Sequence, residues 1–280
     1  MKDILSRFIA LAQRFPKLSA LLIGGASAFG FQPFGLWPVT LVALALLMAL
    51  VASAPRGWRA FGIGWAFGVG HFAVSLNWIA TAFTFQTEIS PWLGWVAVLL
   101  LALYLAVYPA LAAYGAWRVS KRVAPAPTIV APAQAGAAVE CAPTGDQGST
   151  LPAAPAFAGA TASFILAFAS LWIVTEWLRS WVFTGFAWNP LGAAVPTVWA
   201  SPAIWIGSYG LGALMIIGAG LLVELANRRW MTTTVIALLV AAVVGIATMQ
   251  VSAASLTVAI NAKRPGERLI RYVTVVQPNV

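Results

Sequence analysis

The chain has 280 residues, of which 61% are hydrophobic and only 8% are charged. A soluble globular domain carries about 25% charged residues, so this composition excludes that class. The net charge of +9 would suggest nucleic acid as a partner of a soluble protein, but here the 16 Lys and Arg residues fall mostly in short clusters between apolar segments. Such clusters are typical of the loops that orient a membrane protein. We therefore expect membrane lipid as a partner, and no nucleic acid.

The sequence holds one cysteine, Cys141, and one histidine, His71. A single cysteine excludes an internal disulfide framework, and the two residues together cannot form a Cys/His metal cluster. A carboxylate-based metal site stays possible in principle, but we expect neither a metal nor another cofactor.

The apolar segments predict an all-α polytopic membrane protein with about seven transmembrane helices, at roughly 20 residues per crossing. They lie at residues 18–34, 37–54, 60–83, 92–117, 161–182, 203–223 and 231–250. Ala26-Ser27-Ala28 resembles a signal-peptidase site, but the apolar segment continues through Phe29 and Phe31, which favours an uncleaved first span. The transmembrane domain is thus predicted over residues 18–250.

Basic residues alternate between the predicted loops. One set of loops carries Lys2, Arg7, Arg14, Lys17, Arg56, Arg59, Arg118, Lys121, Arg122, Arg228 and Arg229. The intervening loops, 84–91 and 183–202, carry no Lys or Arg. The positive-inside rule then places residues 1–17 in the cytoplasm, and an odd number of spans places residues 251–280 in the periplasm. The later basic residues of that segment are compatible with export if a large domain follows.

Residues 123–160 are rich in Ala, Pro, Gly and Thr and carry almost no charge, which predicts a low-complexity cytoplasmic linker. Cys141 lies within it. A functional thiol needs a shaped, electropositive environment, which this segment does not offer, so Cys141 is interpreted as an ordinary linker residue.

The chain ends in a segment of different character, residues 271–280, "RYVTVVQPNV". Tyr, Val and Thr without helical periodicity, followed by polar residues, predict the first buried strand of a water-soluble domain. One strand cannot bury itself, so we expect residues 251–280 to be the lead-in and first strand of an extracytoplasmic domain.

The segment "LWIVTEWLRSWVFTGFAWNPLG", residues 171–192, is the densest in polar and aromatic groups. Glu176 and Arg179 are spaced i, i+3 and can pair on one helix face. Charges near a membrane are normally paired or functional, so the pair is either structural or part of a binding site. Gly185 and Asn189-Pro190 indicate a shaped loop. The candidate lipid-facing residues here are Glu176, Arg179, Phe183, Thr184, Gly185, Trp188 and Asn189.

Two further segments contribute candidates. In "GGASAFGFQPFGLWP", residues 24–38, Pro33 and Gly35 break the helix beside Phe34. In the third span, Gly62, Gly64, Gly68 and Gly70 predict close helix packing. Asn77 and Trp78 lie near its outer end and could face a lipid headgroup. His71 is interpreted as a hydrogen-bonded packing residue in preference to a proton relay, since no second titratable group lies nearby in the sequence.

The segments "FGFQPFGLWP", "SLNWIA", "TEWLRSWVFTGFAWNPLG" and "VTVVQPNV", in this order and spacing, resemble the bacterial apolipoprotein N-acyltransferase family. The resemblance covers residues 18–280 except the 123–160 linker. It implies a membrane domain that carries an extracytoplasmic nitrilase-like α/β domain, whose first strand is the Val-Gln-x-Asn segment, followed by a closing C-terminal span. The chain would then end at the start of that domain.

The resemblance also implies an activity in the bacterial inner membrane. A thiolate takes an acyl chain from a phospholipid, and the thioester then acylates the diacylglyceryl-cysteine of a lipoprotein. The family's catalytic Glu, Lys and Cys lie beyond this strand, so we expect no catalytic residue in residues 1–280 and no activity from them alone. The alternatives are a transporter, channel or scaffold, which an absent inverted repeat and little intramembrane charge disfavour, and another membrane-tethered nitrilase-like acyltransferase or amidase.

Overall fold

A computed structural model describes residues 12–85, 90–123, 162–182, 185–227 and 230–261. This part of the chain is built of helices, without any strand. The predicted linker at 123–160 with Cys141, and the predicted strand at 271–280, lie essentially outside the described residues. Those two expectations stay predictions.

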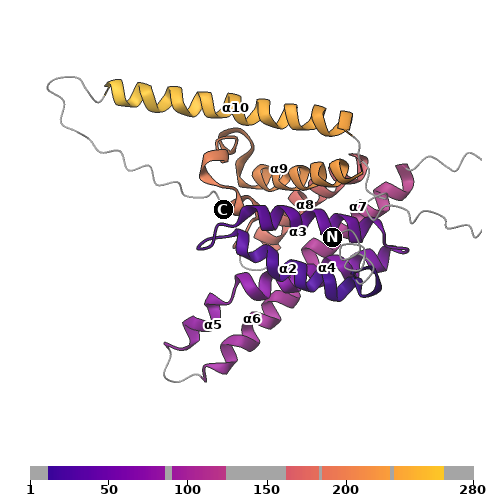
Figure 1. The fold of residues 1–280 in the computed structure, drawn as a ribbon. Coiled ribbons are helices and arrows are strands. Elements are labelled where there is room, and N and C mark those ends of the chain that lie inside the picture. Colours follow the sequence, from indigo (N-terminus) through magenta and orange to yellow (C-terminus); the bar gives the residue numbers. More distant parts are fainter. Residues whose placement is uncertain (1–11, 86–89, 124–161, 183–184, 228–229, 262–280) are drawn as a thin grey trace, which may run out of the picture.

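The helices follow one another in a bundle with two outlying parts (Figure 1). In chain order they are α2 (Pro16–Ser27), η1 (Ala28–Gly30), α3 (Trp37–Ala52), α4 (Gly57–Ser75), α5 (Trp78–Phe83), α6 (Trp92–Leu105), α7 (Val107–Val123), α8 (Ala162–Val182), η2 (Leu191–Ala194), η3 (Thr197–Trp199), α9 (Ala203–Ala226) and α10 (Trp230–Asn261).

Within the described residues, four helical segments are long and apolar enough to cross a membrane. They are Trp92–Arg122, Ala162–Val182, Ala203–Ala226 and Thr233–Ser252, and the shorter apolar helix Trp37–Ala52 accompanies them. The chain is therefore a membrane protein by length and composition of its helices. The count of seven spans is not reached by this measure and stays a prediction.

Two predicted spans are interrupted, each for a local reason. The span at 18–34 stops being helical after Gly30, before Pro33 and Gly35, as their helix-breaking character predicts. The span at 60–83 is divided into α4 and α5 at Leu76 and Asn77. After the first interruption the chain stays in the bundle, whereas after the second it continues into the α5–α6 hairpin, which projects away from the bundle.

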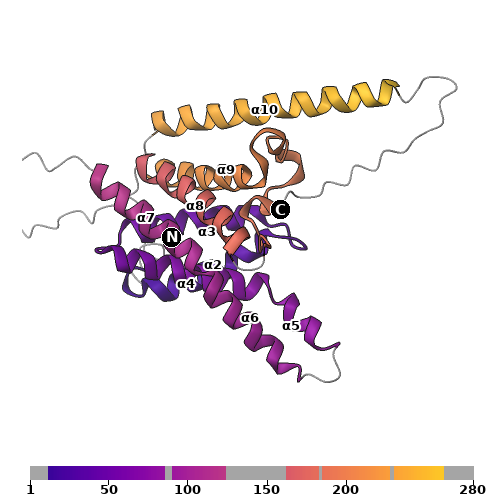
Figure 2. The same ribbon diagram turned by 180° about the vertical axis from the view of Figure 1, so that it is seen from behind.

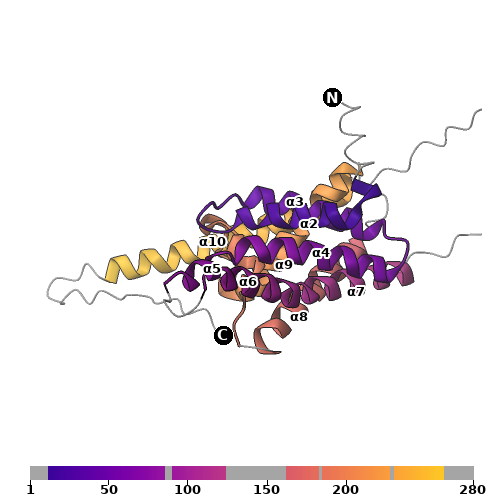
Figure 3. The same cartoon turned by 90° about the horizontal axis from the view of Figure 1, so that it is seen from below.

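Glycines allow α2, α4 and α7 to pack at close range. A Cβ atom on Gly24 of α2 would lie 2.0 Å from the Phe67 carbonyl oxygen of α4, and a Cβ on Gly70 would lie 2.0 Å from the Leu21 oxygen of α2. Gly64 and Gly68 approach α7 in the same way. The predicted small-residue packing is thus confirmed, and Figure 3 shows α2 and α4 side by side.

The core is shared by α2, α3, α4, α7, α8 and α9, and its largest side chains come from α3, α4, α8 and α9. It is filled by Leu44, Leu47 and Met48 from α3, by Phe164, Phe168 and Trp172 from α8, and by Ile216 and Val223 from α9. The α5–α6 hairpin projects away from this core, and α10 runs along its opposite side (Figures 1 and 2). The apolar side chains that these outlying helices expose are those that a bilayer would cover.

We expect Gly70→Val to destabilise the bundle, because the added side chain collides with the backbone of α2. The cost of such overpacking is typically about 1–3 kcal/mol. Thermal unfolding in detergent, followed by size-exclusion chromatography, measures it. The matched control is Gly245→Val on α10, where a Cβ would meet no atom within 4 Å. An equal loss from both substitutions would contradict the close α2–α4 contact.

Candidate functional site

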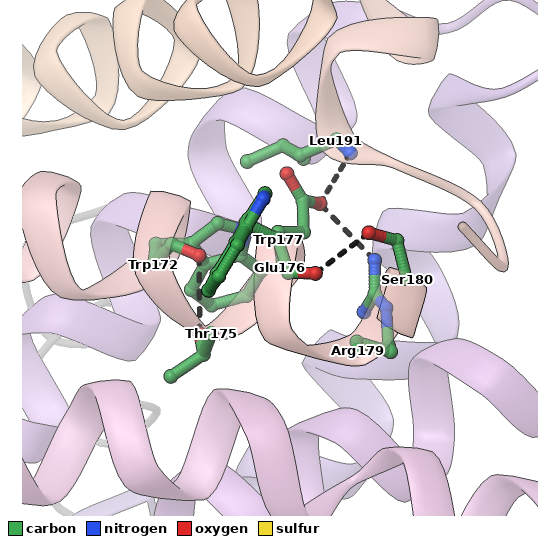
Figure 4. Close-up of polar contacts among 7 residues, drawn as sticks. All are labelled: Trp172, Thr175, Glu176, Trp177, Arg179, Ser180 and Leu191. Carbon is green, nitrogen blue, oxygen red and sulfur yellow. Dashed lines mark hydrogen bonds and ion pairs between the residues drawn. The ribbon is translucent and has the colours of Figure 1, made fainter. Parts of the chain in front are cut away.

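The Glu176–Arg179 pair lies in the interior of the bundle (Figure 4). The two residues are one turn apart on α8, and Arg179 Nη2 lies 3.3 Å from Glu176 Oε1. Both side chains are only 2% exposed. The predicted pairing is confirmed, and its burial places it inside the protein and away from the lipid-facing surface.

The same carboxylate holds the loop that follows α8. The backbone N–H of Leu191, at the start of η2, donates to Glu176 Oε1 at 2.6 Å. Gly212 of α9 leaves room beside the other oxygen, since a Cβ there would lie 3.3 Å from Glu176 Oε2. Hydrogen bonds to a charged acceptor are stronger than those between neutral groups. Glu176 therefore fixes the loop between α8 and α9 against the bundle.

Arg179 is covered by α4. Its guanidinium carbon lies 5.1 Å from the centroid of the Phe72 ring, a distance at which a cation is attracted to the ring face. The pair thus connects α8 to both the loop and α4.

A small internal cavity borders the pair. Its volume is about 10 Å³, and its walls include Ser27, Thr40, His71, Trp172, Glu176, Arg179 and Asn189. Arg179 Nε is buried without a hydrogen-bond partner among the described residues. A space of this size accommodates about one water molecule, so it cannot admit a phosphate headgroup. The geometry favours the structural interpretation of the pair over direct contact between Arg179 and a lipid phosphate.

His71 closes another side of this cavity. Its Nδ1 lies 2.7 Å from Ser27 Oγ, which itself donates to the Gly24 carbonyl at 2.6 Å. Since a serine hydroxyl carries one hydrogen, His71 Nδ1–H must be the donor to Ser27, which leaves Nε2 as an acceptor. Thr40 Oγ1 donates to the Ser27 carbonyl at 2.7 Å. These contacts agree with the hydrogen-bonded packing residue expected from the sequence.

The loop after α8 has the unusual backbone that its sequence indicated. Gly185, Trp188 and Asn189 all adopt positive φ angles, of 66°, 37° and 55°. The Phe186 and Trp188 rings meet edge to face at 4.9 Å between centroids. Trp188 also packs against the cluster around Phe72 and Leu76. The loop is therefore a shaped segment, in line with the sequence.

The structure brings only part of the candidate set together. Glu176, Arg179 and Asn189 share the cavity, and Trp188 packs against the cluster of Phe72, which also lines the cavity. Asn77, Trp78 and Phe34 are exposed on the surface. Phe183 and Thr184 lie outside the described residues. Sequence reasoning did not identify four residues of this site, Ser27, Thr40, Trp172 and Leu191. Thr40 is a polar residue in an otherwise apolar helix, and this signal could have been used. The backbone contact of Leu191 has no signal in the sequence.

Known proteins were compared with the chain as a whole. Residues 23–222 match the family model described as the apolipoprotein N-acyltransferase N-terminal domain. The chain is 31% identical over 217 residues to an apolipoprotein N-acyltransferase of Ralstonia nicotianae, covering 77% of this chain and 35% of the relative. The chain is 30% identical over 238 residues to an apolipoprotein N-acyltransferase of Shewanella oneidensis, covering 81% of this chain and 38% of the relative. The chain thus spans little more than a third of the length of these curated relatives.

We expect Glu176→Ala and Arg179→Ala each to destabilise the protein by roughly 3–5 kcal/mol, because each leaves an unpaired buried charge. The double substitution should cost clearly less than the sum of the two. Thermal unfolding in detergent completes this double-mutant cycle, and Lys121→Ala, which removes an exposed cation, is the control.

A charge-swapped variant, E176R/R179E, separates the two contacts of Glu176. It restores an ion pair but removes the acceptor for the Leu191 N–H, so we expect only partial recovery of stability. Additive effects of the single changes would show that the two residues act independently.

Proposed function

Because the chain belongs to the apolipoprotein N-acyltransferase family, we propose that it forms the membrane part of an enzyme that acylates lipoproteins. The acyl donor is a phospholipid, and the acceptor is the N-terminal diacylglyceryl-cysteine of a lipoprotein. The observation that carries this proposal is the family match over residues 23–222, which spans α3 to α8, the C-terminal part of α2 and most of α9.

In this proposal, residues beyond the described helices perform the chemistry. A carboxylate base removes the proton of a cysteine thiol, and the thiolate attacks the ester carbonyl of the phospholipid to form a thioester and a lysophospholipid. The lipoprotein amine then attacks the thioester, which forms the amide and returns the thiol. No residue of 1–280 carries the acyl group, and Cys141 stays a linker residue.

The membrane part positions the lipid in this scheme. The Glu176–Leu191 hydrogen bond holds the loop after α8, and the Arg179–Phe72 contact holds α8 against α4. Phe186, Val198 and Trp199 of that loop and of η3 expose their side chains. These apolar groups form a lipid-accessible rim beneath the nitrilase-like catalytic domain.

The proposed setting is the inner membrane, with the N-terminus in the cytoplasm and residues 251–280 in the periplasm. Its support is the gathering of basic segments at one end of the bundle. Lys17 of α2 lies against Gly62 of α4. The indole N–H of Trp117 donates to the Ala54 carbonyl at 2.8 Å. This contact brings the end of α7, with Arg118 and Lys121, close to the start of α4. By the positive-inside rule this end faces the cytoplasm.

A chimaera tests the proposed function. Residues 1–250 are joined to the remaining part of the Ralstonia nicotianae relative and expressed in cells depleted of their own enzyme. We expect the chimaera to restore N-acylation of lipoproteins, detected by mass spectrometry of their N-terminal peptides, and the chain 1–280 alone to give no product. Product formed by 1–280 alone, and abolished by Cys141→Ala, would contradict the assignment of the chemistry.

Reporter fusions test the orientation separately. A phosphatase, active only in the periplasm, and a fluorescent protein, active only in the cytoplasm, are each fused after residue 140 and after residue 255. We expect cytoplasmic signal at residue 140 and periplasmic signal at residue 255. Signals from the same compartment at both positions would show that the span count is wrong.

A further inference from the structure

A groove lined by cations lies at the opposite end of α2 from the Glu176 cavity. Its volume is about 500 Å³, and Arg14, Lys17 and Arg59 line it together with Phe15, Leu18 and Ile63. Ser27, which borders the cavity, is ten residues further along α2 than Lys17, or about 15 Å at the rise of an α-helix. The groove is therefore separate from the cavity.

Among the described residues, the three cations of this groove have no acidic partner. None of them forms an ion pair with another residue in the part of the chain that the structure describes. The acidic residues in that part, Glu176 and Glu224, are both buried elsewhere in the bundle. Three like charges around one groove repel one another, and a bound anion would relieve this repulsion.

Lys17 reaches the groove because of a glycine on the neighbouring helix. A Cβ atom on Gly62 of α4 would lie 2.9 Å from Lys17 Cε and 3.4 Å from Nζ. The missing side chain at Gly62 lets the lysine stem lie along α4, next to Arg59 one turn earlier. Lys17 of α2 and Arg59 of α4 therefore line the same groove.

An apolar stripe continues from the groove along α2. Leu18 and Leu22 are exposed, and their i, i+4 spacing places them on one face of α2. Phe15, directly before the helix, is also exposed and lines the groove beside Leu18. The surface is cationic at the helix end and apolar below it, which matches an amphiphile with an anionic head. Basic pockets between membrane helices bind such headgroups.

We propose that this groove binds an anionic phospholipid, with its phosphate against Arg14, Lys17 and Arg59 and an acyl chain along Phe15, Leu18 and Leu22. The site goes beyond the acyl transfer proposed above and does not depend on it. Its occupant stays in the leaflet that the basic end of the bundle faces.

Native mass spectrometry of the full chain in a neutral detergent tests the proposal. The probes are dioleoylphosphatidylglycerol, which is anionic, and dioleoylphosphatidylcholine, which has the same acyl chains and no net charge. We expect the anionic lipid to bind more tightly, and the variant K17A/R59A to lose this preference, by about fivefold for each cation removed. The matched control, R118A/K121A, removes two cations from the same end of the bundle that do not line the groove.

Two further arms identify the ligand. The variant L18Q/L22Q should bind the anionic lipid more weakly, because the acyl chain of that lipid lies along the apolar stripe. Soluble glycerol phosphate should not compete with the anionic lipid for the groove, because it has no acyl chain. Equal binding of the two lipids, equal loss in K17A/R59A and R118A/K121A, or full competition by glycerol phosphate would each overturn the proposal. Because Lys17 and Arg59 are exposed, circular dichroism and elution volume should confirm that the variants are folded.

Discussion

The buried carboxylate of Glu176 is the constraint on which the arrangement of the surrounding helices depends. An ionised carboxylate cannot remain in an apolar interior without a partner charge and hydrogen bonds. Arg179 supplies the charge and the Leu191 backbone supplies the hydrogen bond. Since these partners come from α8 and from the following loop, movement of the loop would leave the charge unsatisfied. The polar contact thus acts together with the apolar contacts of Trp188, Leu191 and Ala194, which also hold this loop.

Close packing of α2 on α4 fixes the positions of the side chains on the other side of the ion pair. Gly70 precedes His71 and Phe72 directly, and Gly24 lies three residues before Ser27. The contact of the two backbones therefore fixes where these side chains point. Phe72 reaches the guanidinium of Arg179, and His71 reaches Ser27. In a bilayer, where lipid tails compete with apolar side chains for the same surfaces, such small-residue contacts are a main source of helix association.

The sequence predicted the features that depend on neighbouring residues in the chain. Hydropathy identified the apolar helices, and the i, i+3 spacing identified the Glu176–Arg179 pair. It could not predict contacts that only the fold creates, such as that of Leu191, 15 residues from Glu176. The predicted span at 92–117 lies within one apolar helical segment, Trp92–Arg122. Its division into α6 and α7 at Ala106 was not predicted, although Pro109 has no N–H to donate to Leu105. Hydropathy alone does not register a missing hydrogen bond.

The same pair of helices serves both ends of the bundle. At the C-terminal end of α2, Ser27 and His71 close the cavity beside the ion pair, and at its N-terminal end Lys17 lies on Gly62 to line the basic groove. Glycines at 24, 62 and 70 make each of these contacts possible, because any side chain there would separate the helices or displace the lysine. The small residues of α2 and α4 therefore do more than allow packing. They set which polar groups face the interior and which face the charged end of the bundle.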